Sequence, residues 1–151
     1  MQATIISDTS CLILLNNIGE LQLLQKLYSE IITTQIVADE FGSHLPDWIN
    51  IQNPNDTEIQ VVLNAALDKG EASALALALE QEDCLLIIDE LKGRKLARQL
   101  GITITGTLGV LAQAKHNGYI PMLKPLLDKV KRTDFRLSER LIQETLRQVG
   151  E

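Results

Sequence analysis

The sequence predicts an α/β protein, a three-layer α/β/α sandwich around a mainly parallel sheet of four or five strands. Short β-branched or apolar runs alternate along the chain with segments of helical spacing, which is the pattern of βαβ units. The run 84–88 is apolar throughout, as expected of a strand that helices cover on both faces. With 151 residues, 45% of them hydrophobic, the chain can bury one sizeable core, and we expect one domain over residues 1–151.

In the first half of the chain, β-branched residues predict strands at 4–6 and 31–34, with a short edge strand within 48–51. Asp8 and the two hydroxyl residues after it predict the start of a helix that runs to about residue 15, because short polar side chains cap helix starts. Leucine spacing predicts a second short helix over 21–27, and helical spacing resumes over 35–41 and about 56–67.

The second half begins with a run of alternating alanine and leucine after Gly70. Alternation can indicate a strand, but both residues favour helices and the run extends to Gln81, so we expect a helix that is buried on every side. The remaining elements are a strand at 84–88, a basic amphipathic helix at 91–100, a strand at 102–104 and helices at 106–117, about 122–131 and about 138–149.

Composition excludes several classes of protein. No apolar run approaches the roughly 20 residues of a membrane helix, and the amino terminus has no basic leader typical of a signal peptide. Cys11 and Cys84 sit in apolar runs without metal-ligand spacing, which favours buried free thiols and a cytoplasmic location. Aromatic residues make up only 3%, so few side chains are available to stack on exposed bases.

The net charge of -6 is unevenly distributed. Residues 1–75 hold 2 basic and 10 acidic side chains, whereas 91–136 hold 10 basic and 2 acidic ones. An acidic half joined to a basic stretch can act on a polyanion if a cation fills the acidic part. Ordinary solvated helix faces explain the same charges without any ligand.

Four carboxylates are predicted to meet at one edge of the sheet. Asp8 and Asp89 each follow a strand directly, and ligands of parallel sheets bind beyond the carboxyl ends of strands. The helix that starts at Glu71, roughly 18 Å long, runs back along a strand of roughly 17–20 Å, so Glu71 returns to the same edge. Glu40 lies on a helix that begins at this edge, and helical spacing barely separates it from Asp39.

Four acids at one edge repel one another, by roughly 4 kcal/mol for each pair about 4 Å apart. Proton uptake or a divalent cation relieves this repulsion, and oxygen ligands suit Mg²⁺ or Mn²⁺. Such an ion can act on a phosphodiester bond. Each acid also has a purely structural interpretation: Asp8 and Asp89 as helix caps, Glu71 as a partner of the helix dipole, and Glu40 as a solvated residue.

Other side chains near these acids are weaker candidates. Glu90 is either a spare ligand or a helix-start charge, and Ser10 is a further accessory candidate. The Thr107 hydroxyl could contact a phosphate, although capping of the following helix explains it equally well. Four basic residues after Asp89 could bind a phosphate backbone or form a solvated face: Lys92, Arg94, Lys95 and Arg98.

The motifs around these acids resemble those of the PIN domain, a fold of metal-dependent ribonucleases that includes VapC-type toxins. The segment 6–10 is similar to the family's first-strand aspartate motif, and 37–40 to its helical glutamate. Residues 70–72 resemble the third acidic motif, and 87–90 the fourth. The segment 105–111 resembles one branch of largely uncharacterised bacterial PIN-like proteins. The resemblance runs along nearly the whole chain.

This resemblance implies Mg²⁺- or Mn²⁺-dependent cleavage of RNA by Asp8, Glu40, Glu71 and Asp89, and we expect the RNA to be single-stranded. It also implies a homodimer and, for toxin members, a small antitoxin protein that binds near the site. Glu71 stands where many toxins have aspartate, and no aspartate occurs within 103–107. A PIN-like module that binds nucleic acid or protein without turnover is therefore the competing interpretation. A phosphoacceptor domain is a third, but its usual paired first-strand acids and late-strand lysine are not evident.

Overall fold

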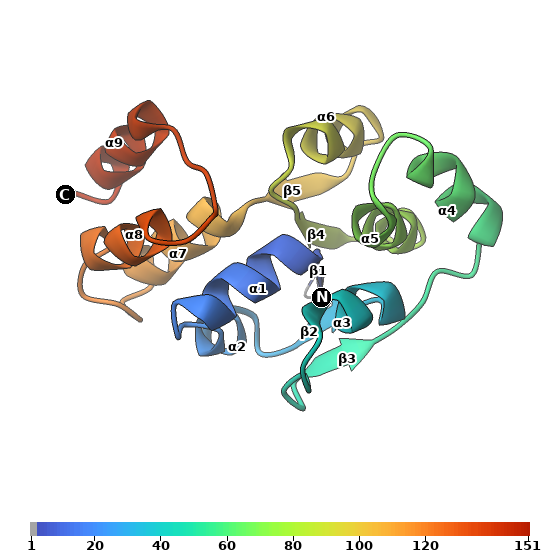
Figure 1. Ribbon diagram of the computed structural model, residues 1–151, viewed down its shortest axis with the longest axis horizontal. Helices are drawn as coiled ribbons and strands as arrows, with labels where there is room; N and C mark the ends of the chain where they lie inside the picture. Colours follow the sequence, from blue (N-terminus) through green and yellow to red (C-terminus); the bar gives the residue numbers. More distant parts are fainter. Residues whose placement is uncertain (1–2) are drawn as a thin grey trace.

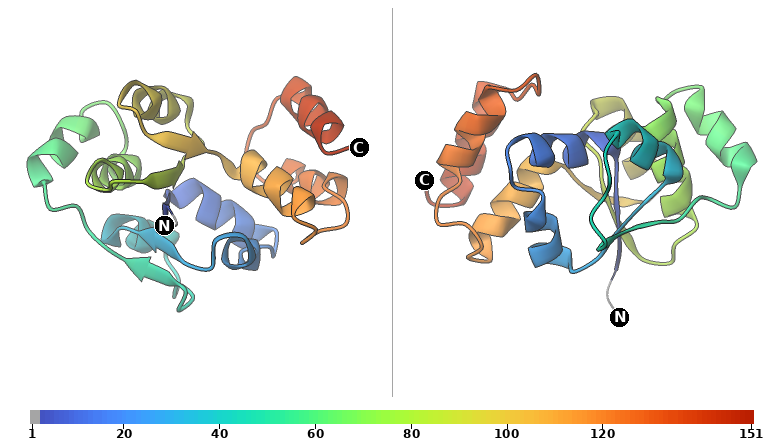
Figure 2. Two further views of the ribbon diagram at one scale, coloured as in Figure 1. Left: turned by 180° about the vertical axis from the view of Figure 1, so that it is seen from behind. Right: turned by 60° about the horizontal axis from the view of Figure 1, so that its bottom comes forward.

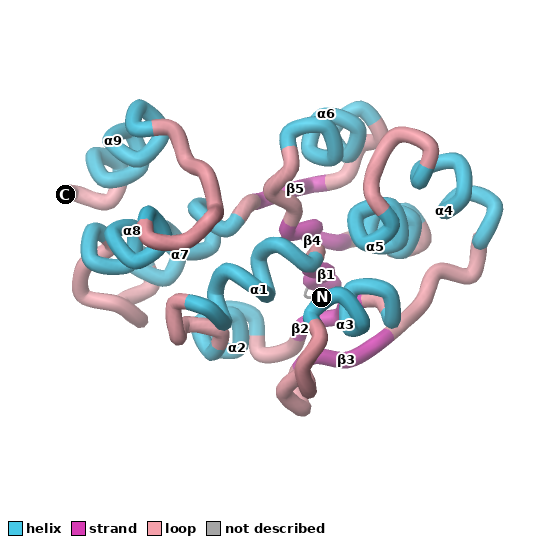
Figure 3. Tube along the Cα trace, viewed as in Figure 1, coloured by secondary structure: helices cyan, strands magenta, loops and turns pink. Residues whose placement is uncertain are grey.

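The structure is a computed structural model that describes residues 3–151, and its centre is a five-stranded, wholly parallel sheet. The strands lie in the order β3-β2-β1-β4-β5, seen as a row of arrows in Figure 1 and as the magenta segments in Figure 3. Their bounds are β1 Thr4–Ser7, β2 Ile31–Thr33, β3 Ile49–Ile51, β4 Cys84–Ile87 and β5 Thr103–Thr105. The predicted α/β class, parallel sheet and edge strand are confirmed.

Helices cover both faces of this sheet, which confirms the three layers. One layer contains α1 (Thr9–Asn17), α2 (Gln22–Tyr28), α3 (Gln35–Phe41) and α7 (Thr107–His116). The other contains α4 (Thr57–Asn64), α5 (Lys69–Leu79) and α6 (Leu91–Gln99). In the right-hand view of Figure 2 the blue helices and the green helices lie on opposite sides of the strands. The chain ends with α8 (Lys124–Lys131) and α9 (Glu139–Gln148).

Local hydrogen bonds explain where the elements begin and end. Thr34 ends β2 because its hydroxyl accepts a hydrogen bond from the Val37 amide and caps α3. The strand expected at 102–104 lies one residue later, since the Ile102 amide still donates to the Ala97 carbonyl at the end of α6. These differences are of one or two residues, within the usual uncertainty of element boundaries.

The core is aliphatic and divided by the sheet into two clusters. Ile87 and Ile31 face the first cluster, with α1, α2 and α7, whereas Ile6, Leu86 and Ile88 face the second, with α4 and α5. As predicted, α5 is buried on every side, from Gly70 to Ala78. Both cysteines are buried free thiols. Over residues 3–151, no helix combines the length and the hydrophobicity that crossing a membrane requires.

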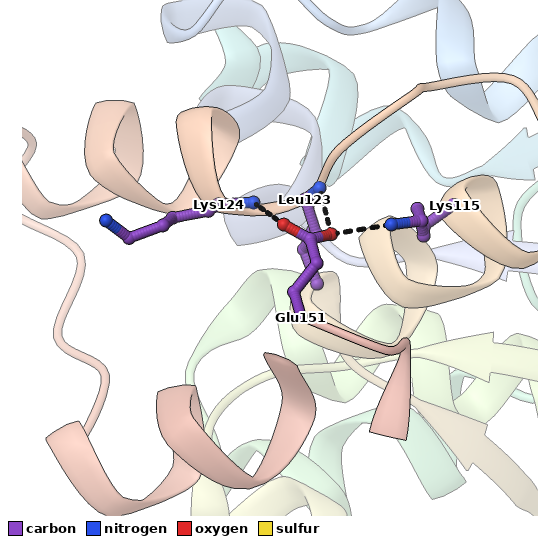
Figure 4. A network of polar contacts seen from close by, with 4 residues as sticks. All are labelled: Lys115, Leu123, Lys124 and Glu151. Carbon is purple, nitrogen blue, oxygen red and sulfur yellow. Dashed lines mark hydrogen bonds and ion pairs between the residues drawn. The ribbon is translucent and has the colours of Figure 1, made fainter. Parts of the chain in front are cut away.

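The last three helices form a lobe beside the β5 edge of the sheet (Figure 1), and Glu151 fastens its end. The Glu151 carboxylate accepts hydrogen bonds from the amides of Leu123 and Lys124, at 2.6 and 3.1 Å, and pairs with Lys115 Nζ at 2.9 Å (Figure 4). It thus caps the start of α8 while holding the end of the chain against α7. This cap explains why α8 begins at Lys124, two residues later than expected.

Candidate active site

The candidate site lies at the carboxyl ends of β1 and β4, which are neighbours in the middle of the sheet. From β1 the chain crosses to β2, and from β4 it crosses the other way to β5, so α1 and α6 leave on opposite faces. Such a switch point leaves a crevice beyond the strand ends, where open α/β sheets bind ligands. Because Ser7 pairs with Ile87, Asp8 and Asp89 leave neighbouring strands at nearly the same level.

Asp8 is buried, with only 1% of its surface exposed. Its Oδ1 accepts a hydrogen bond from the Cys11 amide at 3.2 Å, which caps α1, and its Oδ2 accepts one from the Asp89 amide at 3.3 Å. The pKa of Asp8 is raised to about 8, mainly by burial and in part by the neighbouring charge of Asp89, although the two hydrogen bonds oppose this shift. Asp8 is therefore both a helix cap and an acid that ionises at a cost.

Asp89 does not cap the helix that follows it, because Glu90 does so by accepting from the Lys92 and Gly93 amides at 2.9 and 3.3 Å. Asp89 reaches instead to α7, where it accepts from the Thr107 amide at 2.8 Å and from the Thr107 hydroxyl at 2.6 Å. Burial raises the pKa of Asp89, while these hydrogen bonds and the charge of Arg94 lower it in part. Thr107 thus positions Asp89, and Glu90 caps α6, while its charge contributes to the raised pKa of Glu71.

Glu71 lies on the first turn of α5 with 8% of its surface exposed. Its Oε2 is buried and has no hydrogen-bond partner. The pKa of Glu71 is raised to about 7, mainly by burial and in part by the nearby Asp68 carboxylate, which is the cap of α5. The charge of Glu71 also contributes to the raised pKa of Asp8, so the two carboxylates face the same crevice.

Glu40 lies on α3 at the margin of this group. Its Oε1 accepts a hydrogen bond from the Thr9 hydroxyl, which places it beside the residue that follows Asp8. Asp39 points elsewhere: it accepts from Gln35 Nε2 at 2.8 Å and lines a separate pocket with the 43–47 loop. Of the two acids that helical spacing could not separate, Glu40 is the one on the side of the crevice.

Three glycines make room for these side chains. A Cβ on Gly70 would lie 3.1 Å from Glu40 Cδ and 2.9 Å from Thr9 Oγ1. On Gly93 it would lie 3.2 Å from Glu71 Oε2, and on Gly106 it would lie 2.8 Å from Asp89 Oδ1. Each glycine therefore stands against one acid, and a larger residue would displace that acid. Sequence reasoning did not assign Gly93, Gly106 or Asp68 a role at the site, and it placed Thr9 only at the start of a helix, although all four are close in sequence to the acidic motifs.

Only one of the four basic candidates reaches the crevice. Arg94 is partly buried, its Nη1 donates to the Ile88 carbonyl at 2.8 Å, and the Cβ position of Gly106 is 2.8 Å from the same nitrogen. Burial and the charge of Arg98 lower the pKa of Arg94, whereas Asp89 and Asp8 raise it. Lys92, Lys95 and Arg98 are exposed on α6. Ser10 is also exposed and lines a different groove, with Asn17 and Phe135.

The donors at this crevice have the chemistry that a hard divalent ion requires. Buried carboxylates with raised pKa values gain from a cation, and Glu71 Oε2 is a buried oxygen without a partner. In the side-chain arrangement of residues 3–151, however, no three His, Cys, Asp or Glu residues converge as a ready metal site. Asp8, Asp89 and Glu71 are neighbours, and completing a coordination sphere requires their side chains to move toward a common point.

A parallel α/β/α sandwich with carboxylates at its central switch point is the arrangement expected of a PIN-like protein. A family model for DUF3368, described as a PIN domain, matches residues 4–151. The chain therefore belongs to the PIN-domain family, as its motifs indicated, and PIN domains are in general nucleases. No curated protein matches the chain closely enough to be counted as a relative.

Proposed function

We propose that the protein is a metal-dependent endoribonuclease that hydrolyses phosphodiester bonds of single-stranded RNA. Asp8, Glu40, Glu71 and Asp89 would hold Mg²⁺ or Mn²⁺. The observation that supports this most directly is the buried pair of Asp8 and Asp89 beside the unpartnered Glu71 Oε2, because such a group is tolerable at neutral pH only when protonated or bound to a cation.

The other residues of the crevice have roles that follow from their contacts. Thr107 holds the Asp89 carboxylate in one orientation through two hydrogen bonds. Arg94 supplies a positive charge beside Asp89 where a phosphate of the substrate would otherwise meet only acids. The chemistry that a divalent ion supplies in such a site is polarisation of a phosphodiester oxygen and stabilisation of charge on the leaving oxygen.

The decisive experiment compares RNA cleavage by four purified proteins in Mn²⁺ and in chelator. Asp89→Asn and Glu40→Gln should lose cleavage, whereas Asp39→Asn, which removes one charge next to Glu40 but outside the crevice, should retain it. Equal cleavage by Asp89→Asn and the unaltered protein would assign the activity to a contaminant. If Asp39→Asn lost RNA cleavage and Glu40→Gln retained it, Asp39 and not Glu40 would be the second acid of the site.

We further propose that the protein acts in the cytoplasm as the toxin of a toxin–antitoxin pair, as a homodimer that a small antitoxin protein inhibits. Family membership supports this proposal. Expression of the unaltered chain should arrest bacterial growth and Asp89→Asn should not. Light scattering of the purified protein at several concentrations tests the dimer, and a monomer throughout would contradict it.

A second candidate function is a PIN-like module that binds nucleic acid without cleaving it. The observation that favours it is the lack of three converging ligand side chains within residues 3–151. Under this alternative, RNA binding weakens steeply with salt, and no cleavage occurs with Mg²⁺ or Mn²⁺. Cleavage that requires Asp89 would exclude it.

A further inference from the structure

A pocket of about 410 Å³ opens beside Asp89 and Arg94. On one side it is lined by the end of β5 and the start of α7, and on the other by the 135–141 segment and by α9. In Figure 1 the connection from α8 to α9 runs beside the start of α7. The pocket is therefore continuous with the crevice that holds the acids, but most of its walls belong to elements that the acid motifs do not include.

The lining of the pocket is amphipathic and positively charged. Arg94 and Arg136 both line it, and Asp89 is its single acid. Among the described residues, neither arginine takes part in an ion pair, and the Asp89 carboxylate is already engaged by Thr107. The rest of the lining combines apolar side chains with hydrogen-bonding ones, which include Phe135, Leu137, Leu141, Ser138 and Gln148.

These features match a nucleotide better than other ligands. A base has apolar faces and a hydrogen-bonding edge, and its phosphate carries the negative charge that two unpaired arginines would neutralise. The volume falls within the range of about 300–1,000 Å³ that is usual for small-ligand sites. Since Asp89 belongs to both the pocket and the crevice, a nucleotide held here would place its neighbouring phosphate beside the acids.

We propose that this pocket binds one nucleotide of single-stranded RNA next to the bond to be cleaved, with Phe135 packing on the base and Arg136 contacting a phosphate. The position of the bond to be cleaved rests on the proposed nuclease function, whereas binding of the nucleotide does not. The pocket would then select which nucleotide precedes or follows the cleavage site. Phe135, the only aromatic residue in its lining, would supply a surface for stacking on the base in a protein with only 3% aromatic residues.

The test is binding of a fluorescent single-stranded oligoribonucleotide in chelator, where cleavage does not occur. Phe135→Leu keeps an apolar side chain but removes stacking, and Arg136→Gln removes one charge from the pocket. Their matched controls are Tyr119→Leu, at an exposed aromatic residue outside the pocket, and Arg132→Gln, at an exposed arginine that lines a different pocket. Thermal melting of each variant verifies that it is folded.

We expect Phe135→Leu to weaken binding by about tenfold and Tyr119→Leu to leave it within about twofold. Arg136→Gln should lower the slope of log affinity against log salt by about 0.7, the value for one phosphate contact on a single strand, and Arg132→Gln should not change that slope. If RNA binds equally to all four variants, or binds the folded protein not at all, the pocket proposal is wrong and the site serves another ligand, such as an acidic peptide.

The binding experiment tests the pocket independently of the proposed nuclease function. Loss of binding in Phe135→Leu and Arg136→Gln without metal-dependent cleavage by the unaltered protein would support the nucleotide pocket and contradict the nuclease. Asp89-dependent cleavage with unchanged binding in both variants would support the nuclease and overturn the pocket.

Discussion

At the scale of single residues, Asp8 stabilises the fold by capping a helix, but its negative charge is unfavourable because the side chain is buried. It caps α1 through Cys11 and contacts the Asp89 amide, yet burial raises its pKa from 3.8 to about 8. An asparagine retains the cap, since it is as good at a helix start as aspartate, and it removes the charge, while its amide nitrogen cannot accept the hydrogen bond from the Asp89 amide. Asp8 is therefore the position where the requirement for a counter-ion can be separated from the requirement for folding.

The first prediction concerns the pH dependence of stability in Asp8→Asn. The unfolded chain releases the Asp8 proton near pH 4, whereas the folded chain holds it to about pH 8. The folded state binds more protons across this range, so the free energy of unfolding of the metal-free protein falls as pH rises, by at most about 1.4 kcal/mol per pH unit for this group. Asp8→Asn should flatten this fall and be the more stable protein near pH 8.

Urea unfolding in chelator at several pH values between about 5 and 8 measures this difference. Asp39→Asn, which removes an exposed carboxylate outside the crevice, is the control and should follow the unaltered protein. The pKa of Glu71 is also raised, to about 7. The free energy of unfolding of Asp8→Asn should therefore still fall with pH, but less steeply. If the free energy of unfolding of Asp8→Asn changed with pH in parallel with that of the unaltered protein, Asp8 would not be the source of the pH dependence.

A second prediction at this scale concerns Thr107, the residue that positions Asp89. Thr107→Val keeps the shape of the side chain and the amide bond but removes the hydroxyl that donates to Asp89 Oδ2. The free energy of unfolding near pH 7 should fall by about 1.5–3 kcal/mol, the range for a hydrogen bond to a charged group. Thr107→Ser restores the hydroxyl and should recover most of the loss in urea unfolding. Equal stability of Thr107→Val and Thr107→Ser would contradict the role given to this bond.

At the scale of elements, most helices and strands could be predicted because their signals are local. The apolar run at 84–88, the alanine–leucine helix and the cap at Asp8 each involve only neighbours in sequence. The strand order is different in kind. That β1 lies between β2 and β4 depends on pairing between residues far apart in the sequence, for example Ser7 with Ile87, and no periodicity encodes such a choice.

The same distinction explains what could be predicted of the site. Asp8 and Asp89 follow strands, so their common edge could be inferred from the parallel sheet alone. The attachment of Asp89 to Thr107, the contact of Glu40 with Thr9 and the pocket wall formed by 135–141 are contacts between distant elements. Side-chain direction across such contacts depends on packing that sequence spacing does not determine.

The packing of α3 against α5 supports a third prediction, at Gly70. A Cβ at this position would collide with the Glu40 carboxylate, which lies on an exposed residue and can turn outward. Gly70→Ala should therefore remain folded, with the free energy of unfolding within about 1 kcal/mol of the unaltered value, since the helix gains roughly 1 kcal/mol and loses one hydrogen bond of similar worth. It should nevertheless reduce Mn²⁺ binding as much as Glu40→Ala does.

Isothermal titration with Mn²⁺ compares Gly70→Ala, Glu40→Ala and the double variant. If Gly70 acts only by making room for Glu40, the double variant should bind as weakly as either single variant and no more weakly. Additive losses would show that Gly70 affects the site by another route, and unchanged binding in Glu40→Ala would remove Glu40 from the set of ligands.

At the scale of the whole molecule, the fold gathers part of the unevenly distributed charge into an acidic crevice with arginines beside it. The carboxylates of Asp8, Glu71 and Asp89 gather at the switch point, and Arg94 and Arg136 line the pocket that continues from it. A protein of net charge -6 can therefore present a positive surface next to its acids. A divalent ion in the crevice would strengthen the binding of a polyanion further, because two such ions would change the net charge by +4.

The last prediction is that Mg²⁺ or Mn²⁺ stabilises the whole protein, and does so more at higher pH. At a metal concentration 100 times the dissociation constant, one site should raise the free energy of unfolding by about 2.7 kcal/mol. Because the ion must displace protons from Asp8 and Glu71, whose pKa values lie near 8 and 7, its affinity should increase as pH rises from about 6 to 8. Thermal melting with Mn²⁺, against KCl of equal ionic strength, measures the shift, and Asp8→Asn should lose most of it. A shift that KCl reproduces, or that Asp8→Asn retains in full, would mean that the ions act on the surface charge and not at the crevice.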